Sequence, residues 1–149
     1  MSDKLVVQTP LHPYLDFNGR CEEAINFYRD AIGAELVHLS RFKDAPPTPA
    51  QEGCPGPAAE NGEKVMHATV KIGPTVVMMA DGRCGGQPTF AGFWLTLGAS
   101  TAEGAAALFN ALAPGGKVIM PLGETFFAAS FGMLTDRFGL GWMVIAEKH

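Results

Sequence analysis

The chain has 149 residues, of which 47% are hydrophobic and 17% are charged, and its formal net charge at pH 7 is −4. This composition excludes a disordered polypeptide and predicts one compact domain spanning residues 1–149. The 11 lysines and arginines are scattered without forming a run, so no nucleic-acid partner is expected. No apolar stretch approaches the roughly 20 residues that cross a bilayer, and the N-terminus lacks the apolar core of a signal peptide. We therefore expect a cytoplasmic protein without a membrane partner.

The first half of the sequence predicts a strand, a helix and three further strands. Residues 12–18 alternate polar and apolar side chains with the period of a half-buried strand. Residues 21–32 place apolar side chains at helical spacing, and Gly33 supplies a stop for that helix. One strand is predicted for residues 34–43, and two strands joined by a tight turn are predicted for residues 65–81.

The same order of elements recurs in the second half. Residues 91–98 form an apolar strand, and residues 100–103 form a capping box in which the Ser100 hydroxyl and a Glu carboxylate bond exposed N–H groups. A helix follows, and Lys117 begins a short strand. Residues 130–136 and 141–146 then pair as two strands across a glycine turn.

These series divide the chain into module one, at about residues 10–82, and module two, at about residues 90–147. The helices of the two modules are offset by 81 residues and their hairpin turns by 66, so module one contains an insertion of 15 residues. The insertion falls in residues 44–64, which hold five of the 11 prolines and three glycines. We expect a surface loop there, with a lid over a pocket or an arm that reaches a second subunit as the alternative.

Several stretches together resemble a known superfamily. They are Pro13-Tyr14-Leu15, Phe17-Asn18-Gly19, Gly33-Ala34-Glu35, Met66-His67-Ala68, Met79-Ala80-Asp81, Glu124-Thr125-Phe126-Phe127, Phe131-Gly132, and Thr135 through Gly139 with Trp142-Met143. With them the chain resembles the vicinal oxygen chelate superfamily of glyoxalase I, extradiol dioxygenases and bleomycin-resistance proteins, and most of all its PhnB-like branch. The resemblance implies an α+β fold in which two paired β-α-β-β-β modules form a glyoxalase-like cleft, and it implies a homodimer.

The resemblance also implies four metal-ligand positions on four strands. His12 matches the first position, but the second falls near Met78, the third near Phe93 and the fourth near Met143. A thioether or a phenyl ring does not bind a hard divalent cation as a carboxylate or an imidazole does. We therefore expect no cofactor.

A metal site made of other residues is the alternative. His12 and His67 could bind a divalent metal if Glu124 or Asp81 supplied a carboxylate, and the protein would then be a metal-dependent lyase, isomerase or dioxygenase. The plainer interpretation makes each histidine a hydrogen-bonded wall residue and Asp81 a turn-forming residue.

Side-chain alternation predicts which residues face the cleft. Ala68 and Val70 share one face of their strand, so His67 and Thr69 point the opposite way. The predicted ligand-binding cleft is lined by His12, Tyr14, His67, Thr69, Met78, Phe93, Phe131 and Met143. An apolar lining with a few polar groups is typical of a small-molecule site.

The sequence therefore favours a PhnB-like protein that binds a small molecule in an apolar cleft, with no catalytic residue and no activity assigned. A structural dimer module without a ligand is a third interpretation. No glycine-rich turn from strand to helix with a following acidic residue is present for a nucleoside cofactor, which argues against a methyltransferase.

Overall fold

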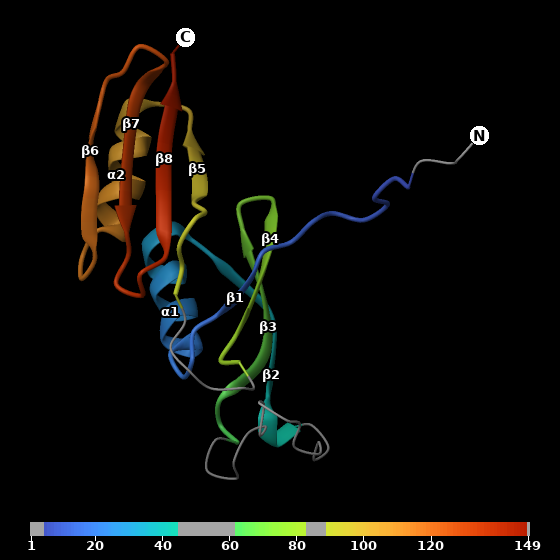
Figure 1. Ribbon diagram of the computed structural model, residues 1–149. Helices are drawn as coiled ribbons and strands as arrows, with labels where there is room; N and C mark the ends of the chain where they lie inside the picture. The colour runs from blue at the N-terminus through green and yellow to red at the C-terminus, as the bar shows by residue number, and fades with distance from the viewer. Residues whose placement is uncertain (1–4, 45–61, 83–88, 149) are drawn as a thin grey trace.

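The computed structural model describes residues 5–44, 62–82 and 89–148, which form two modules of the same β-α-β-β-β order (Figure 1). Module one consists of β1 (Tyr14–Asp16), α1 (Cys21–Ile32), β2 (Glu35–Arg41), β3 (Val65–Ile72) and β4 (Thr75–Ala80), with a 3-10 turn (Phe42–Asp44) after β2. Module two consists of β5 (Leu95–Ala99), α2 (Ala102–Leu112), β6 (Lys117–Gly123), β7 (Ala128–Thr135) and β8 (Gly141–Glu147). The predicted α+β fold of paired modules is confirmed.

Each module forms its own four-stranded sheet, and the two sheets have the same topology. The strand orders are β1-β4-β3-β2 and β5-β8-β7-β6, in which the first and last strands of a module pair in parallel. Tyr14 of β1 corresponds to Thr96 of β5, and the register shift before His38 in β2 recurs before Met120 in β6. The insertion predicted in module one lies between β2 and β3, but its residues 45–61 fall outside the described residues.

Helix α1 forms where its apolar spacing predicts. Cys21, Ala24, Ile25 and Tyr28 are the buried residues of its inner face. Gly33 ends the helix with φ 72°, a left-handed conformation that glycine adopts without a Cβ penalty. The sequence prediction of this helix and its stop is confirmed.

The N-terminus of α2 differs from the prediction by one residue. The capping residue is Thr101, whose hydroxyl accepts a hydrogen bond of 3.0 Å from the Gly104 N–H. The prediction that Ser100 makes this cap is wrong. Ser100 and Thr101 are adjacent hydroxyl residues, and Thr101 is the one that adopts the extended N-cap backbone, with φ −136°.

Strand β5 is shorter than predicted, since it begins at Leu95 rather than at residue 91. The apolar residues before it serve the junction between the modules instead. The Phe90 ring lies 5.6 Å from Phe17 and 6.4 Å from Phe93, measured between ring centroids. Of the apolar residues before β5, Phe90 therefore packs against the core, whereas Phe93 is 40% exposed.

Each helix packs on its own sheet and the two helices contact each other, so the two modules share one hydrophobic core. Helix α1 contacts β2, β3 and α2, while α2 contacts β5, β7 and β8. At the junction the Tyr28 ring of α1 lies 5.6 Å from the Trp142 ring of β8, and Phe17 lies 5.6 Å from Phe138. Within the described residues, neither helix has the length and apolar character needed to cross a membrane.

Candidate functional site

Each sheet has one face buried against the helices and one face left open. In β3 the side chains of Ala68 and Val70 are fully buried, whereas the alternating residues His67 and Thr69 are only partly buried. In β8 Val144 is fully buried and its neighbour Met143 is partly exposed. We call the outer surface of each sheet its open face, and the predicted alternation along β3 is confirmed.

The open face of sheet one is polar. One row of register partners crosses β1, β4, β3 and β2, and we call it the polar row: Tyr14, Met78, Thr69 and His38. In the next row His67 pairs with Ser40. Two hydrogen bonds orient the imidazoles: His38 Nε2 lies 2.8 Å from Ser40 Oγ, and His67 Nε2 lies 3.4 Å from Thr69 Oγ1. The rings of Tyr14 and His67 are 5.8 Å apart.

The open face of sheet two is apolar. At the positions that correspond to the polar row, this face carries Thr96, Met143, Met133 and Met120 across β5, β8, β7 and β6, and we call these residues the methionine row. Phe131 lies in the following row, and its ring is 5.2 Å from that of Phe127. The four strands have charged side chains only at the first residue of β6 and the last residue of β8.

Six of the eight predicted cleft residues lie on these open faces. They are Tyr14, His67, Thr69 and Met78 on sheet one and Phe131 and Met143 on sheet two. His12 lies two residues before β1, and Phe93 lies two residues before β5, where its ring contacts Phe90 of the junction. The contacts His38–Ser40, His67–Thr69 and Tyr14–His67 all stay within sheet one.

The geometry gives no support to a metal centre of the family type. Within residues 5–44, 62–82 and 89–148, no three His, Cys, Asp or Glu side chains are grouped so that they could hold a metal ion. His12, His67 and Glu124 are therefore not assembled into a ligand set there. The methionines at two of the four family positions do not fit a hard cation.

Asp81 is a buried structural residue, and the prediction that it is a turn-forming residue is wrong, because its carboxylate bonds distant backbone N–H groups instead. Its side chain is 5% exposed. Oδ1 accepts hydrogen bonds from the backbone N–H groups of Gly19 and Cys21, and Oδ2 accepts one from Val65, at 2.7 to 2.8 Å. This carboxylate holds the start of α1 against β3 and is committed to those three donors. Burial raises the pKa of the Cys21 thiol, which stays protonated.

Asp136 is a second buried carboxylate, which sequence reasoning missed. Its Oδ2 accepts hydrogen bonds from the Tyr28 hydroxyl at 2.5 Å and from Trp142 Nε1 at 2.9 Å. Its Oδ1 accepts from the backbone N–H groups of Phe138 and Leu140. Burial and the Asp136 charge raise the pKa of Tyr28 well above its ordinary value. Asp136 therefore ties α1 of module one to β8 of module two.

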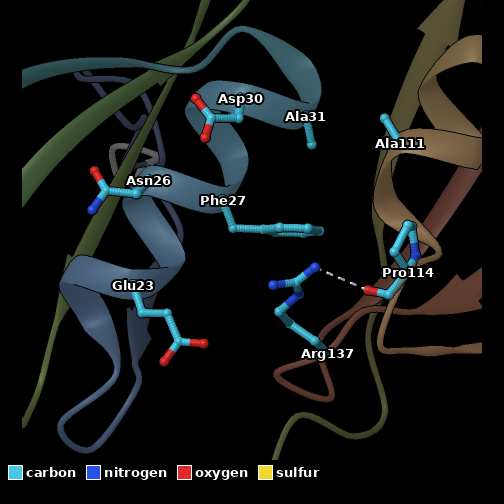
Figure 2. A pocket seen from close by; sticks show the side chains of 8 residues that line it. All are labelled: Glu23, Asn26, Phe27, Asp30, Ala31, Ala111, Pro114 and Arg137. Carbon is cyan, nitrogen blue, oxygen red and sulfur yellow. Dashed lines mark hydrogen bonds between the residues drawn. The ribbon is translucent and has the colours of Figure 1, made fainter.

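A groove of about 600 Å³ lies between α1 and α2, on the helix side of the molecule (Figure 2). The Arg137 guanidinium crosses it, 4.1 Å from the Phe27 ring centroid and 3.3 Å from the Pro114 carbonyl oxygen. Its polar residues Glu23, Asn26, Asp30 and Arg137 are exposed. A smaller cavity of about 100 Å³ lies between β4 and β5. Thr96 lines the smaller cavity, but the other residues of the two rows line neither the groove nor this cavity.

Comparison with known proteins agrees with the fold. The model of the Glyoxalase/Bleomycin resistance protein/Dioxygenase superfamily matches residues 11–144. Protein YjdN of Escherichia coli K12 is 37% identical over 142 residues, which cover 94% of this chain and 97% of that protein. The crystal structure of PA1353 from Pseudomonas aeruginosa is 40% identical, with a TM-score of 0.82 over 95% of this chain and all of its own. The PhnB protein of Bacillus cereus is 28% identical, with a TM-score of 0.75 over 93% of this chain and 99% of its own.

Proposed function

Because this chain belongs to the Glyoxalase/Bleomycin resistance protein/Dioxygenase superfamily, we propose that it binds a small molecule between the open face of sheet one and the open face of sheet two from a second copy of the chain. The observation that carries this proposal is the pair of unlike open faces. Hydrogen-bonding groups gather on one, and methionine and phenylalanine side chains gather on the other. A largely apolar lining with a few polar groups is the usual composition of a ligand site.

A second copy is part of the proposal because apolar side chains of a single chain are left in solvent. Met120 is 44% exposed on the open face of sheet two, and Phe127 is 47% exposed beside it. Residues 5–11 leave the body of the molecule as an extended arm (Figure 1), in which Leu5, Val7 and Leu11 are 80 to 101% exposed. Contiguous exposed apolar surface of this kind marks an interface.

The proposed ligand binds without a metal, and the protein has no assigned reaction. Three of the family's four metal positions are occupied by Met78, Phe93 and Met143, which do not fit a divalent cation, so we propose no catalytic step through a metal. A methyltransferase activity, which the name of the Bacillus cereus protein includes, is also left out, because this sequence lacks a nucleoside-binding glycine turn.

The test combines oligomeric state with ligand response. We expect the wild-type chain to sediment as a dimer and to be stabilised by members of a panel of planar aromatic compounds and antibiotics. A ligand at 100 times its Kd adds about 2.7 kcal/mol to the free energy of unfolding. Met133→Glu places a charge in the methionine row and is expected to abolish both the dimer and the ligand response. Asn110→Glu adds the same charge on the exposed side of α2 and is expected to change neither.

Two results would contradict this proposal. A monomeric wild-type chain would remove the shared site, and a dimer that responds to no compound would leave only the structural dimer module. A stoichiometric metal in tag-free protein, measured by elemental analysis and lost in His12→Ala, would favour the metal-dependent lyase, isomerase or dioxygenase instead.

A further inference from the structure

We infer that the ligand is an aromatic carboxylate, with its acid group held by His38 and His67 and its ring against the methionine row. This inference rests on the proposed function, because it requires the two open faces to enclose one molecule. Neither membership of the superfamily nor the names of the relatives specify the head group or the body of the ligand.

The acid group is assigned from the hydrogen-bonding capacity of sheet one. His38 and His67 lie on adjacent strands at neighbouring register positions, because His38 pairs with Thr69 and His67 pairs with Ser40. Each imidazole is held through Nε2 by a hydroxyl group, at 2.8 Å for His38 and 3.4 Å for His67. Among the described residues the hydrogen bonds of these two imidazoles engage only Nε2. In the tautomer in which each Nε2 accepts from the hydroxyl, each Nδ1 is an N–H donor, and two such donors suit the two oxygens of a carboxylate.

The other charged groups of this face are accounted for. Lys71 of β3 is the register partner of Glu35 of β2, a placement that brings opposite charges near each other at one end of the two strands. Asp16 lies on the edge strand β1, beside Gly82, whose built Cβ would be 3.6 Å from the Asp16 carboxyl carbon. These charged groups lie at the border of the face, so imidazole and hydroxyl groups occupy its centre.

The ring is assigned from sheet two. Met120, Met133 and Met143 are register partners on three adjacent strands, and Phe131 follows in the next row. Thioether sulfur makes favourable contacts with aromatic rings and adapts to their shape. No charge interrupts these rows, since the charged residues of β5 to β8 lie only at the ends of strands.

The experiment uses three probes that share one ring system: 1-naphthoate, 1-naphthalenemethanol and 1-naphthylmethylamine. Calorimetric titration of the full chain is expected to give at least tenfold tighter binding for the carboxylate than for the alcohol, and weaker binding still for the amine. The double variant His38→Gln, His67→Gln is expected to lose that tenfold advantage while its affinity for the alcohol stays within twofold. Lys71→Gln is the control and is expected to keep the advantage.

The outcomes separate the two proposals. If all three probes bind equally, or the amine binds best, the head-group inference is wrong and the proposed function stands. If the histidine variant keeps the preference and Lys71→Gln loses it, the assignment to imidazole is wrong. If no probe binds the wild-type chain, the enclosed site itself fails and the inference fails with it.

Discussion

Two modules with the same strand order and the same bulge present opposite surfaces. The row Tyr14, Met78, Thr69 and His38 of sheet one corresponds to the row Thr96, Met143, Met133 and Met120 of sheet two. The repeated backbone therefore fixes where side chains stand, while the residue types decide what each surface can bind. A duplicated scaffold that differentiates in this way gives a ligand one polar wall and one apolar wall.

The buried sides of the modules differ as well. Asp81 accepts three backbone N–H groups, all within module one, whereas Asp136 joins side chains of both modules. Module one is thus held by its carboxylate at the start of its helix, and module two uses its carboxylate to attach itself to module one.

The largest expected effect comes from Asp136→Asn. Each carboxylate oxygen of Asp136 accepts two hydrogen bonds, so the amide nitrogen of the asparagine would face two donor groups at either position. We therefore expect a loss of about 3 kcal/mol or more in the free energy of unfolding. In Asp81→Asn the amide nitrogen can face the single donor Val65, so the loss is expected to be smaller. Urea denaturation of both variants measures the difference. An equal or larger loss for Asp81→Asn would show that the cross-module bonds are not the stronger tie.

Gly132→Ala is expected to have an intermediate effect. Gly132 of β7 corresponds to Ala68 of β3, but a Cβ on Gly132 would lie 2.7 Å from the Phe109 ring and 3.0 Å from the Leu122 Cα. We expect this overpacking to cost about 2 kcal/mol in thermal or urea unfolding. The matched change Ala68→Gly is expected to cost about 1 kcal/mol, through backbone entropy. An unchanged stability for Gly132→Ala would mean that α2 packs more loosely on its sheet than α1 does.

Asp16→Asn is expected to have the smallest effect. Burial, and then the nearby Asp81 charge, raise the pKa of Asp16, so ionisation of Asp16 opposes folding. Stability is therefore reduced as the pH rises above the unfolded pKa of about 3.9. We expect Asp16→Asn to raise stability at pH 7 by no more than about 0.5 kcal/mol, and to give no difference at pH 3. Denaturation at the two pH values measures this, and a destabilised variant at pH 7 would mean that the carboxylate has a partner on the open face.

The sequence predicts the elements well because local patterns determine them. The period of α1 and Gly33 at its end are both local, and so is the alternation that separates Thr69 from Val70. The exact cap of α2 is harder, since Ser100 and Thr101 are equally capable residues and only the backbone angle distinguishes them.

Long-range partners explain what the sequence could not predict. Asp136 resembles a turn residue until Tyr28, 108 positions earlier, is placed against it. Phe93 resembles a strand residue until Phe90 and Phe17 form the junction. Alternation likewise predicts which side chains face outward from each sheet, but it carries no information about which sheet another sheet will meet.

The bond between Tyr28 and Asp136 gives the molecule an internal optical reporter. The chain has two tyrosines, of which Tyr14 is 52% exposed and Tyr28 is fully buried. Since the native fold keeps the Tyr28 phenol protonated, alkali beyond the ordinary phenol value of about 10 draws the equilibrium toward the unfolded chain. The phenolate absorbance of Tyr28 should consequently emerge only as the two halves of the molecule separate.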